Sequence, residues 1–185
     1  MPRLFLGFEL PPQQAAALVA LAEPIKGLRW QSVEQLHLTL RFFGEVSEQG
    51  TADLQSILRV LSGSRFALQI KGVGYFGSPA RPSILWTGVA DPAALQALRA
   101  ELDQLLEGHC APDPQRFVPH VTLARLGSGA GKLNNFLARH KQLQLPDWRA
   151  SELCLFSSEA GAEGSRYAVL ARYPLGSVGV LDHHL

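Results

Sequence analysis

The sequence contains the pattern His-x-Thr-Leu twice, once beginning at His37 and once at His120. Both copies lie in runs that favour β-strands. Side chains two residues apart in a strand share a face, roughly 6.6 Å apart along it. Thr39 therefore lies beside His37, and Thr122 beside His120. If the two strands meet, two imidazoles and two hydroxyls surround one small anion, which suits acid–base chemistry at a phosphate without a metal.

The histidine pair can supply an acid and a base together. An imidazole has an ordinary pKa near 6.5, so near neutral pH one histidine can be neutral while its partner is protonated. Phosphodiester cleavage uses this combination, because one proton leaves the nucleophile while another reaches the departing oxygen. Threonine hydroxyls can donate to phosphate oxygens and stabilise the charge that grows in the transition state. A lone histidine or threonine on a strand is usually structural, and it is the repetition that indicates a site.

Two arginines follow the motifs. Arg41 is the next residue on the face of Thr39 if the strand is unbroken. Arg125, three residues after Thr122, points away from that hydroxyl unless a bulge intervenes. A guanidinium keeps its charge and makes paired hydrogen bonds to phosphate, so both arginines are candidate phosphate-binding residues.

The sequence carries no signature of a metal or cofactor site. It has no His-Glu-x-x-His, no closely spaced cysteine pair and no phosphate loop ending in Gly-Lys-Ser/Thr, so we expect neither a metal nor a cofactor. Cys110 and Cys154 are far apart in the sequence, which is typical of a reducing compartment and predicts the cytoplasm. The apolar runs are too short to span a bilayer, so we expect no membrane association.

Composition and periodicity predict a compact mixed fold. With 185 residues, 46% hydrophobic and 18% charged, the chain suits one domain or two small lobes that share a core. The net charge of +1 predicts that any RNA is held locally, at an end. Strand, helix and motif strand, followed by helix and strands, recur in each half of the sequence. The expected strands are at 3–9, 36–43, 66–76, 84–89, 117–123, 152–156 and 167–173, and the expected helices at 12–22, 47–61, 92–106 and 132–140.

The two motifs resemble those of the 2H phosphoesterase superfamily. The segments 37–46, 81–86 and 117–125 are similar in particular to the bacterial and archaeal RNA 2′,3′-cyclic phosphodiesterase family, often labelled 2′-5′ RNA ligases. The resemblance implies a bilobal α+β fold, in which two antiparallel sheets face a central cleft with helices on the outside and pseudo-twofold internal duplication. We therefore expect one domain of two lobes over residues 1–175 and a tail at 176–185.

The resemblance also implies an activity, the metal-independent hydrolysis of terminal 2′,3′-cyclic phosphates of RNA to 2′-phosphomonoesters. On this chain, His37 would be the general acid that protonates the departing O3′, and His120 the base that activates water. Thr39 and Thr122 would hold phosphate oxygens, and the family pattern has an arginine where Arg125 stands. The pseudo-symmetry leaves open which histidine is the acid. Expected substrates are RNA ends, tRNA fragments or cyclic nucleotides, and the expected state is a monomer.

Two other functions remain open at this point. The same residues can serve joining as well as hydrolysis, so a 2′-5′ RNA ligase acting on tRNA halves is one alternative. A module that binds RNA ends or nucleotides without chemistry is another, although simple binding does not require paired imidazoles.

Overall fold

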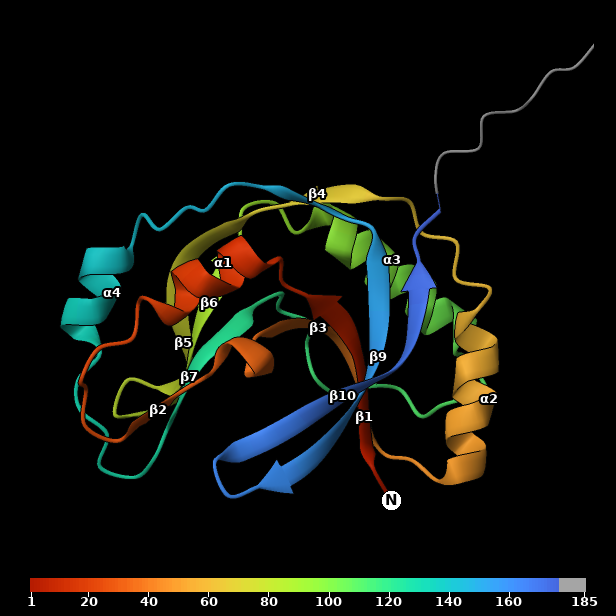
Figure 1. The fold of residues 1–185 in the computed structure, drawn as a ribbon, viewed down its shortest axis with the longest axis horizontal. Coiled ribbons are helices and arrows are strands. Elements are labelled where there is room, and N and C mark those ends of the chain that lie inside the picture. Colours follow the sequence, from red (N-terminus) through yellow and green to blue (C-terminus); the bar gives the residue numbers. More distant parts are fainter. Residues whose placement is uncertain (177–185) are drawn as a thin grey trace, which may run out of the picture.

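The computed structural model describes residues 1–176 and contains ten strands and four helices (Figure 1). The strands are β1 (Arg3–Glu9), β2 (Leu28–Trp30), β3 (His37–Glu45), β4 (Phe66–Leu68), β5 (Ile70–Ser78), β6 (Arg81–Val89), β7 (Val121–Leu126), β8 (Trp148–Ala150), β9 (Glu152–Gly161) and β10 (Gly164–Pro174). The helices are α1 (Pro12–Val19), α2 (Glu48–Leu58), α3 (Ala93–Leu105) and α4 (Asn134–His140), and a 3-10 turn, η1, covers Val33–Gln35.

Eight strands form one antiparallel sheet of two halves. The strand order is β10-β9-β1-β3-β7-β6-β5, with β2 paired to β7, while β4 and β8 form a separate two-stranded sheet. The halves meet at β3 and β7, which share a single pair in register, Leu38 with Val121. Figure 1 shows α4 and α2 at opposite ends of the molecule. The expected α+β fold of two antiparallel halves with peripheral helices is therefore confirmed, with the halves continuous through one residue pair.

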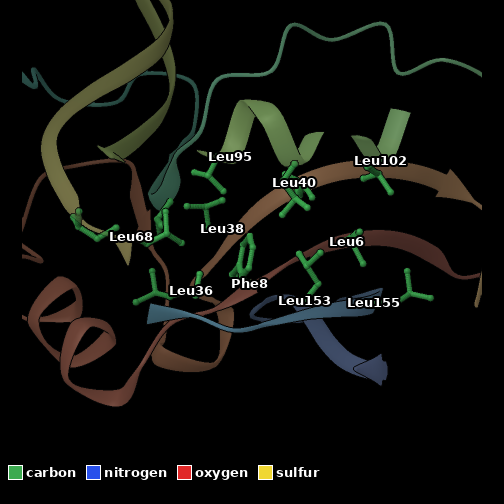
Figure 2. Close-up of a cluster of buried hydrophobic side chains, with 14 of the residues drawn as sticks. Leu6, Phe8, Leu36, Leu38, Leu40, Leu68, Leu95, Leu102, Leu153 and Leu155 are labelled. Atoms are coloured by element: carbon green, nitrogen blue, oxygen red, sulfur yellow. The ribbon is translucent and has the colours of Figure 1, made fainter. Parts of the chain in front are cut away.

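The main core lies on the face of the sheet opposite the two motifs. Leu6 and Phe8 of β1 are buried there, and Phe8 stands in register with Leu38 of β3. Figure 2 shows these side chains together with Leu95 and other leucines of the same buried cluster. Because β1 alternates, its intervening residues face the other side, where Phe5 joins a second small cluster with Phe156. The core thus fixes which residues of the motif strands face outward.

The strands β4 and β8 differ from the sequence prediction. The strand expected at 66–76 is divided at Gln69, because the chain changes sheets there: β4 pairs with β8, whereas β5 pairs with β6. The strand β8 itself had no sequence signal strong enough to predict it.

The second motif also begins differently from the first. The strand expected at 117–123 starts only at Val121, so His120 stands one residue before β7. Pro119 precedes it and has no N–H to donate to a neighbouring strand, which is a physical reason for the late start.

At the C-terminus, Gly176 still belongs to the fold, since its N–H donates to the Gly63 carbonyl at 2.9 Å. The rest of the expected tail, 177–185, lies outside the described residues. No helix within residues 1–176 has the length and apolar character needed to cross a membrane.

Candidate active site

The site is a cavity of about 700 Å³ between the two halves of the sheet. His37 and Thr39 of β3 line it from one half, and His120, Thr122 and Arg125 line it from the other. The pairing of β3 with β7, where the two halves of the sheet meet, explains why the two motifs converge. Both motif strands pair near their histidine ends, at Leu38 and Val121, so the two motifs lie next to each other although they are far apart in the sequence. The expectation that the two His-x-Thr units face one pocket therefore agrees with the geometry.

Each histidine is held in the same way by its own backbone. Nδ1 of His37 lies 2.8 Å from the carbonyl of Gln35, and Nδ1 of His120 lies 2.6 Å from the carbonyl of Val118. In both cases the carbonyl belongs to the residue two positions earlier. A carbonyl only accepts, so Nδ1 carries the hydrogen in each ring. This fixes the tautomer and leaves Nε2 as the nitrogen available to accept or donate a proton.

Aromatic rings enclose both imidazoles. The ring of His37 lies 4.6 Å from that of Phe5 and 4.8 Å, edge to face, from that of Tyr167. His120 stands edge to face with Phe76 at 4.8 Å. The rings limit the orientations open to each imidazole and leave it half-buried.

Burial lowers the pKa of His37 to about 4, with the charges of His120 and Arg125 acting in the same direction and the hydrogen bond to Gln35 opposing them. The pKa of His120 is also lowered, first by burial and further by Arg125, while its bond to Val118 opposes the shift. With only the protein's own charges acting on them, both imidazoles are therefore neutral near pH 7. The negative charge of a bound phosphate opposes these shifts and stabilises a protonated imidazole.

A bulge brings Arg125 to the face of β7 that lines the cavity. In the pairing of β6 with β7, Leu85 stands opposite Ala124 but Trp86 stands opposite Thr122, which leaves Leu123 as an extra residue. The extra residue shifts the alternation by one position, so Arg125 joins Thr122 in lining the cavity. The carbonyl of Leu123 is not left unpaired, since it accepts from the Gln31 N–H at 2.8 Å.

A corresponding bulge in β3 breaks the alternation on which the expected shared face of Arg41 and Thr39 depended, and the Arg41 side chain is buried. In the pairing of β1 with β3, Leu6 stands opposite Arg41 and Gly7 opposite Thr39, which leaves Leu40 as the extra residue. Leu40 and Arg41 are both buried as a result, and Arg41 does not line the cavity of about 700 Å³ that holds both histidines. It lines a smaller cavity of about 240 Å³, which Thr39 and His120 also line.

Arg41 instead belongs to a buried ion-pair network. Its Nη1 lies 2.7 Å from Oδ1 of Asp103, and its Nη2 donates to the Ala111 carbonyl at 2.7 Å. Arg99 pairs with Oδ2 of the same aspartate at 2.8 Å and donates to the Leu40 carbonyl at 2.9 Å. Arg99 also reaches Asp113 at 3.4 Å, in the segment that leads to His120. The network therefore supports the first bulge and the approach to the second motif.

Several lining residues were not predicted from the sequence. Arg29 stands in register with Arg125, and both it and Arg3 line the cavity. The strand of Arg3 was predicted, at 3–9, but that arginine was not predicted as a site residue. The segment of Arg29 reads only as a short strand or turn, and nothing in a single sequence indicates that β2 pairs with β7. Phe42, 51% exposed, also lines the cavity, in register with Phe5. Within residues 1–176 there is no group of three or more histidine, cysteine, aspartate or glutamate side chains placed to hold a metal ion.

Known proteins are similar to this chain in sequence and in fold. Residues 10–162 match the 2′-5′ RNA ligase superfamily. Proteins named RNA 2′,3′-cyclic phosphodiesterase are 30% identical over 154 residues in Aquifex aeolicus, covering 80% of this chain and 82% of that one, and 30% identical over 185 residues in Thermus thermophilus, covering 94% and 90%. A protein of the same name from Aeropyrum pernix is 41% identical over 95 residues, a match that spans 50% of this chain and 54% of that one.

Solved structures are similar over nearly the whole chain. The protein TT0787 of Thermus thermophilus superposes with a TM-score of 0.77 at 26% identity, covering 96% of this chain and all of that one. Escherichia coli LigT, solved with 3′-AMP, gives a TM-score of 0.74 at 24% identity over 95% of this chain and 99% of that one, which shows the shared fold. On the sequence match over residues 10–162, this chain belongs to the 2′-5′ RNA ligase superfamily.

Proposed function

We propose that this protein is an RNA 2′,3′-cyclic phosphodiesterase that opens terminal cyclic phosphates to 2′-phosphomonoesters by paired-histidine catalysis. The observation that carries the proposal is the matched arrangement of His37 and His120. Both lie in one cavity, and both have Nδ1 tied to the carbonyl two residues earlier, so that both rings offer Nε2. The relatives named RNA 2′,3′-cyclic phosphodiesterase support the same activity.

The reaction needs two proton transfers. Water attacks the phosphorus while Nε2 of neutral His120 takes one of its protons. The bond from phosphorus to O3′ breaks, and protonated His37 gives its proton to that oxygen. The product carries the phosphate on O2′ and a free 3′-hydroxyl. After turnover His120 is protonated and His37 neutral, so proton exchange with solvent restores the starting state.

Binding of the phosphate raises the pKa of the proposed general acid, His37. Burial holds the pKa of His37 at about 4, too low for protonation near neutral pH by the protein's charges alone. A cyclic phosphodiester brings one negative charge beside both imidazoles, which stabilises an imidazolium and raises the pKa. Substrate binding and protonation of the acid are therefore coupled. The same negative charge acts on both rings and does not distinguish them. The assignment of His37 as the acid and His120 as the base is therefore a prediction.

The remaining predicted residues stabilise the transition state. Thr39 and Thr122 present hydroxyls from opposite halves of the sheet, and Arg125 adds a permanent charge beside them. Donors already fixed on strands act without reorganisation as negative charge grows on the phosphate oxygens. Arg41, paired with Asp103, has no such role in this proposal.

The test is incubation of the protein with a short RNA that ends in a 2′,3′-cyclic phosphate, in the presence of a strong chelator. We expect full activity and a product phosphate on O2′. A 3′-phosphate product would contradict the assignment of O3′ as the leaving oxygen, and loss of activity in chelator would contradict metal independence. Cytoplasmic location and a monomeric state stay predictions.

The superfamily name leaves ligation as a second candidate. Joining a 5′-hydroxyl to a cyclic phosphate through a 2′-5′ linkage uses the same acid and base, with the 5′-hydroxyl in the place of the attacking water and O3′ again the leaving oxygen. Measuring the two products formed from one cyclic-ended RNA in the presence of a 5′-hydroxyl RNA separates the two functions, and we expect hydrolysis to dominate because water is in large excess.

A further inference from the structure

Two arginines stand side by side on the wall of the cavity. Arg29 of β2 is directly opposite Arg125 of β7 in the antiparallel pairing, so the two side chains share a face, and both line the cavity. Directly opposed residues have Cβ atoms about 4.5–5.5 Å apart, and like charges there destabilise a sheet. None of the ion pairs among residues 1–176 involves either arginine. The pair therefore has two charges that an anion can neutralise.

Arg29 also spans the two halves of the molecule. A Cβ at Gly164, where β10 begins, would lie 3.8 Å from Nε of Arg29 and 2.9 Å from the side-chain nitrogen of Gln35. Gln35 in turn donates to the Ser165 carbonyl at 3.0 Å. The guanidinium thus lies against the β9–β10 turn, at van der Waals distance from the position that a Cβ at Gly164 would take. Its place beside the cavity is defined by contacts with both halves.

The third arginine of the cavity has a different partner. Arg3 of β1 stands opposite Glu45 of β3 in register, so a negative charge faces it across the strands. Glu45 is the single carboxylate among the described lining residues. Arg29, whose opposite residue is another cation, is therefore the better candidate for an anion that comes from outside the protein.

Arg29 does not act on the reaction centre as Arg125 does. The charge of Arg125 lowers the pKa of both His37 and His120, whereas Arg29 is not among the charges that shift either imidazole. We therefore place Arg125 next to the reacting phosphate. Arg29, on the neighbouring strand β2, lies further from the two imidazoles. A second anionic group adjacent to the first would reach Arg29.

We propose that Arg29, beside Arg125, binds the phosphodiester group that precedes the cyclic nucleotide in an RNA chain, and so favours RNA ends over free cyclic mononucleotides. This inference rests on the proposed function. RNA carries its next negative charge one nucleotide before the terminal cyclic phosphate, and a guanidinium matches a phosphodiester through two parallel N–H donors. At about 700 Å³ the cavity is large enough for more than a single phosphate group.

The experiment compares two substrates, adenosine 2′,3′-cyclic phosphate and the dinucleotide ApA with a 2′,3′-cyclic end. For the wild type we expect kcat/KM to be about tenfold higher on the dinucleotide, the effect of one charge-assisted contact. Arg29→Gln should remove this preference, because it lowers kcat/KM more on the dinucleotide than on the mononucleotide. Arg29→Lys should retain part of it, because the charge remains but the paired donors do not. Arg149→Gln is the matched control, since Arg149 lies exposed on β8 in the separate small sheet.

Each outcome decides a different point. Equal loss on both substrates in Arg29→Gln, or an unchanged preference, would overturn the subsite while the phosphodiesterase stands. Loss of the preference in Arg3→Gln instead would place the subsite at the other arginine. If the wild type hydrolyses neither substrate, the proposed function itself fails.

Salt dependence provides a measurement that needs no variant. Each phosphate contact on a single strand contributes about −0.7 to the slope of log affinity against log salt. We expect the wild-type slope of log kcat/KM, measured well below KM, to be steeper by about 0.7 for the dinucleotide than for the mononucleotide. Identical slopes would contradict a second phosphate contact.

Discussion

The motif strands β3 and β7 share one backbone feature, a bulge, but they differ in the groups that support it and in the residues that follow it. Each carries a one-residue bulge directly after its His-x-Thr unit, at Leu40 in one strand and at Leu123 in the other. The freed carbonyl of Leu40 is satisfied by the Arg99 guanidinium, and that of Leu123 by the Gln31 backbone. The placement of the His-x-Thr units is thus duplicated, although the groups that support the two bulges come from unrelated elements.

The side chains that follow each bulge differ between the two halves of the sheet. The inward position is Arg41 in β3 and Ala124 in β7, both buried. The cavity position is Phe42 in β3 and Arg125 in β7. One half therefore offers an apolar ring and the other a cation at equivalent places. The comparison teaches that the symmetric part of the site is the His-x-Thr unit, and that the next cavity residue makes the site asymmetric.

The largest expected effect comes from breaking the symmetric part. His37→Gln and His120→Gln should each lower kcat by about 10²–10⁴-fold, the usual contribution of a general acid or base. The double variant should be far less impaired than the product of the two effects, because the residues act as a unit. Single-turnover hydrolysis of a cyclic-ended RNA measures this, with circular dichroism as the control for folding. A single variant with normal kcat would remove that histidine from the mechanism.

Thr39→Val and Thr122→Val test whether the hydroxyls are equivalent. Each change keeps the shape of the side chain and removes one donor to the growing negative charge. Loss of such a donor costs up to about 10²–10³-fold in kcat. We expect comparable losses in the two variants. A large effect in one and none in the other would restrict the symmetry to the imidazoles.

Arg125→Gln and Arg41→Gln test where the two bulges place these arginines, Arg125 in the lining of the cavity and Arg41 in the interior. Arg125→Gln should lower kcat/KM by about ten- to hundredfold, as expected for a charged contact to phosphate. It should also raise the pKa of both histidines, because Arg125 lowers them. Arg41→Gln should leave kcat near the wild-type value but lower the free energy of unfolding by about 2 kcal/mol, because Asp103 and the Ala111 carbonyl lose the guanidinium that donates to them. The reverse pattern would restore Arg41 as the phosphate ligand.

The smallest expected effect concerns stability in acid. The folded pKa of His37, about 4, is below the ordinary 6.5, so the unfolded chain binds this proton more readily. Stability is therefore intact above pH 6.5 and is lost as pH falls from 6.5 toward 4. Urea unfolding at pH 7 and pH 5 should show the wild type losing about 2 kcal/mol more than His37→Gln. Equal losses would mean that His37 is not buried in the neutral form.

The repeated motif was sufficient to predict the centre of the site, because the period of two in a strand places His37 beside Thr39 whatever the rest of the fold. The arginines required more. A bulge shifts every later residue to the other face, and neither Leu40 nor Leu123 has a side chain that marks it as the extra residue. Alternation alone therefore selected Arg41. Arg29 could not be found, because its role depends on the pairing of β2 with β7, a contact between distant segments.

The most direct test of the central claim, that the two imidazoles act as acid and base on opposite sides of one phosphorus, uses a cyclic-ended RNA in which sulfur replaces the 3′ oxygen. A thiolate leaves without protonation, so the variant that lacks the acid should regain activity on this substrate while the variant that lacks the base should not. We predict recovery in His37→Ala alone. Recovery in both variants, or in neither, would contradict the division of roles between His37 and His120.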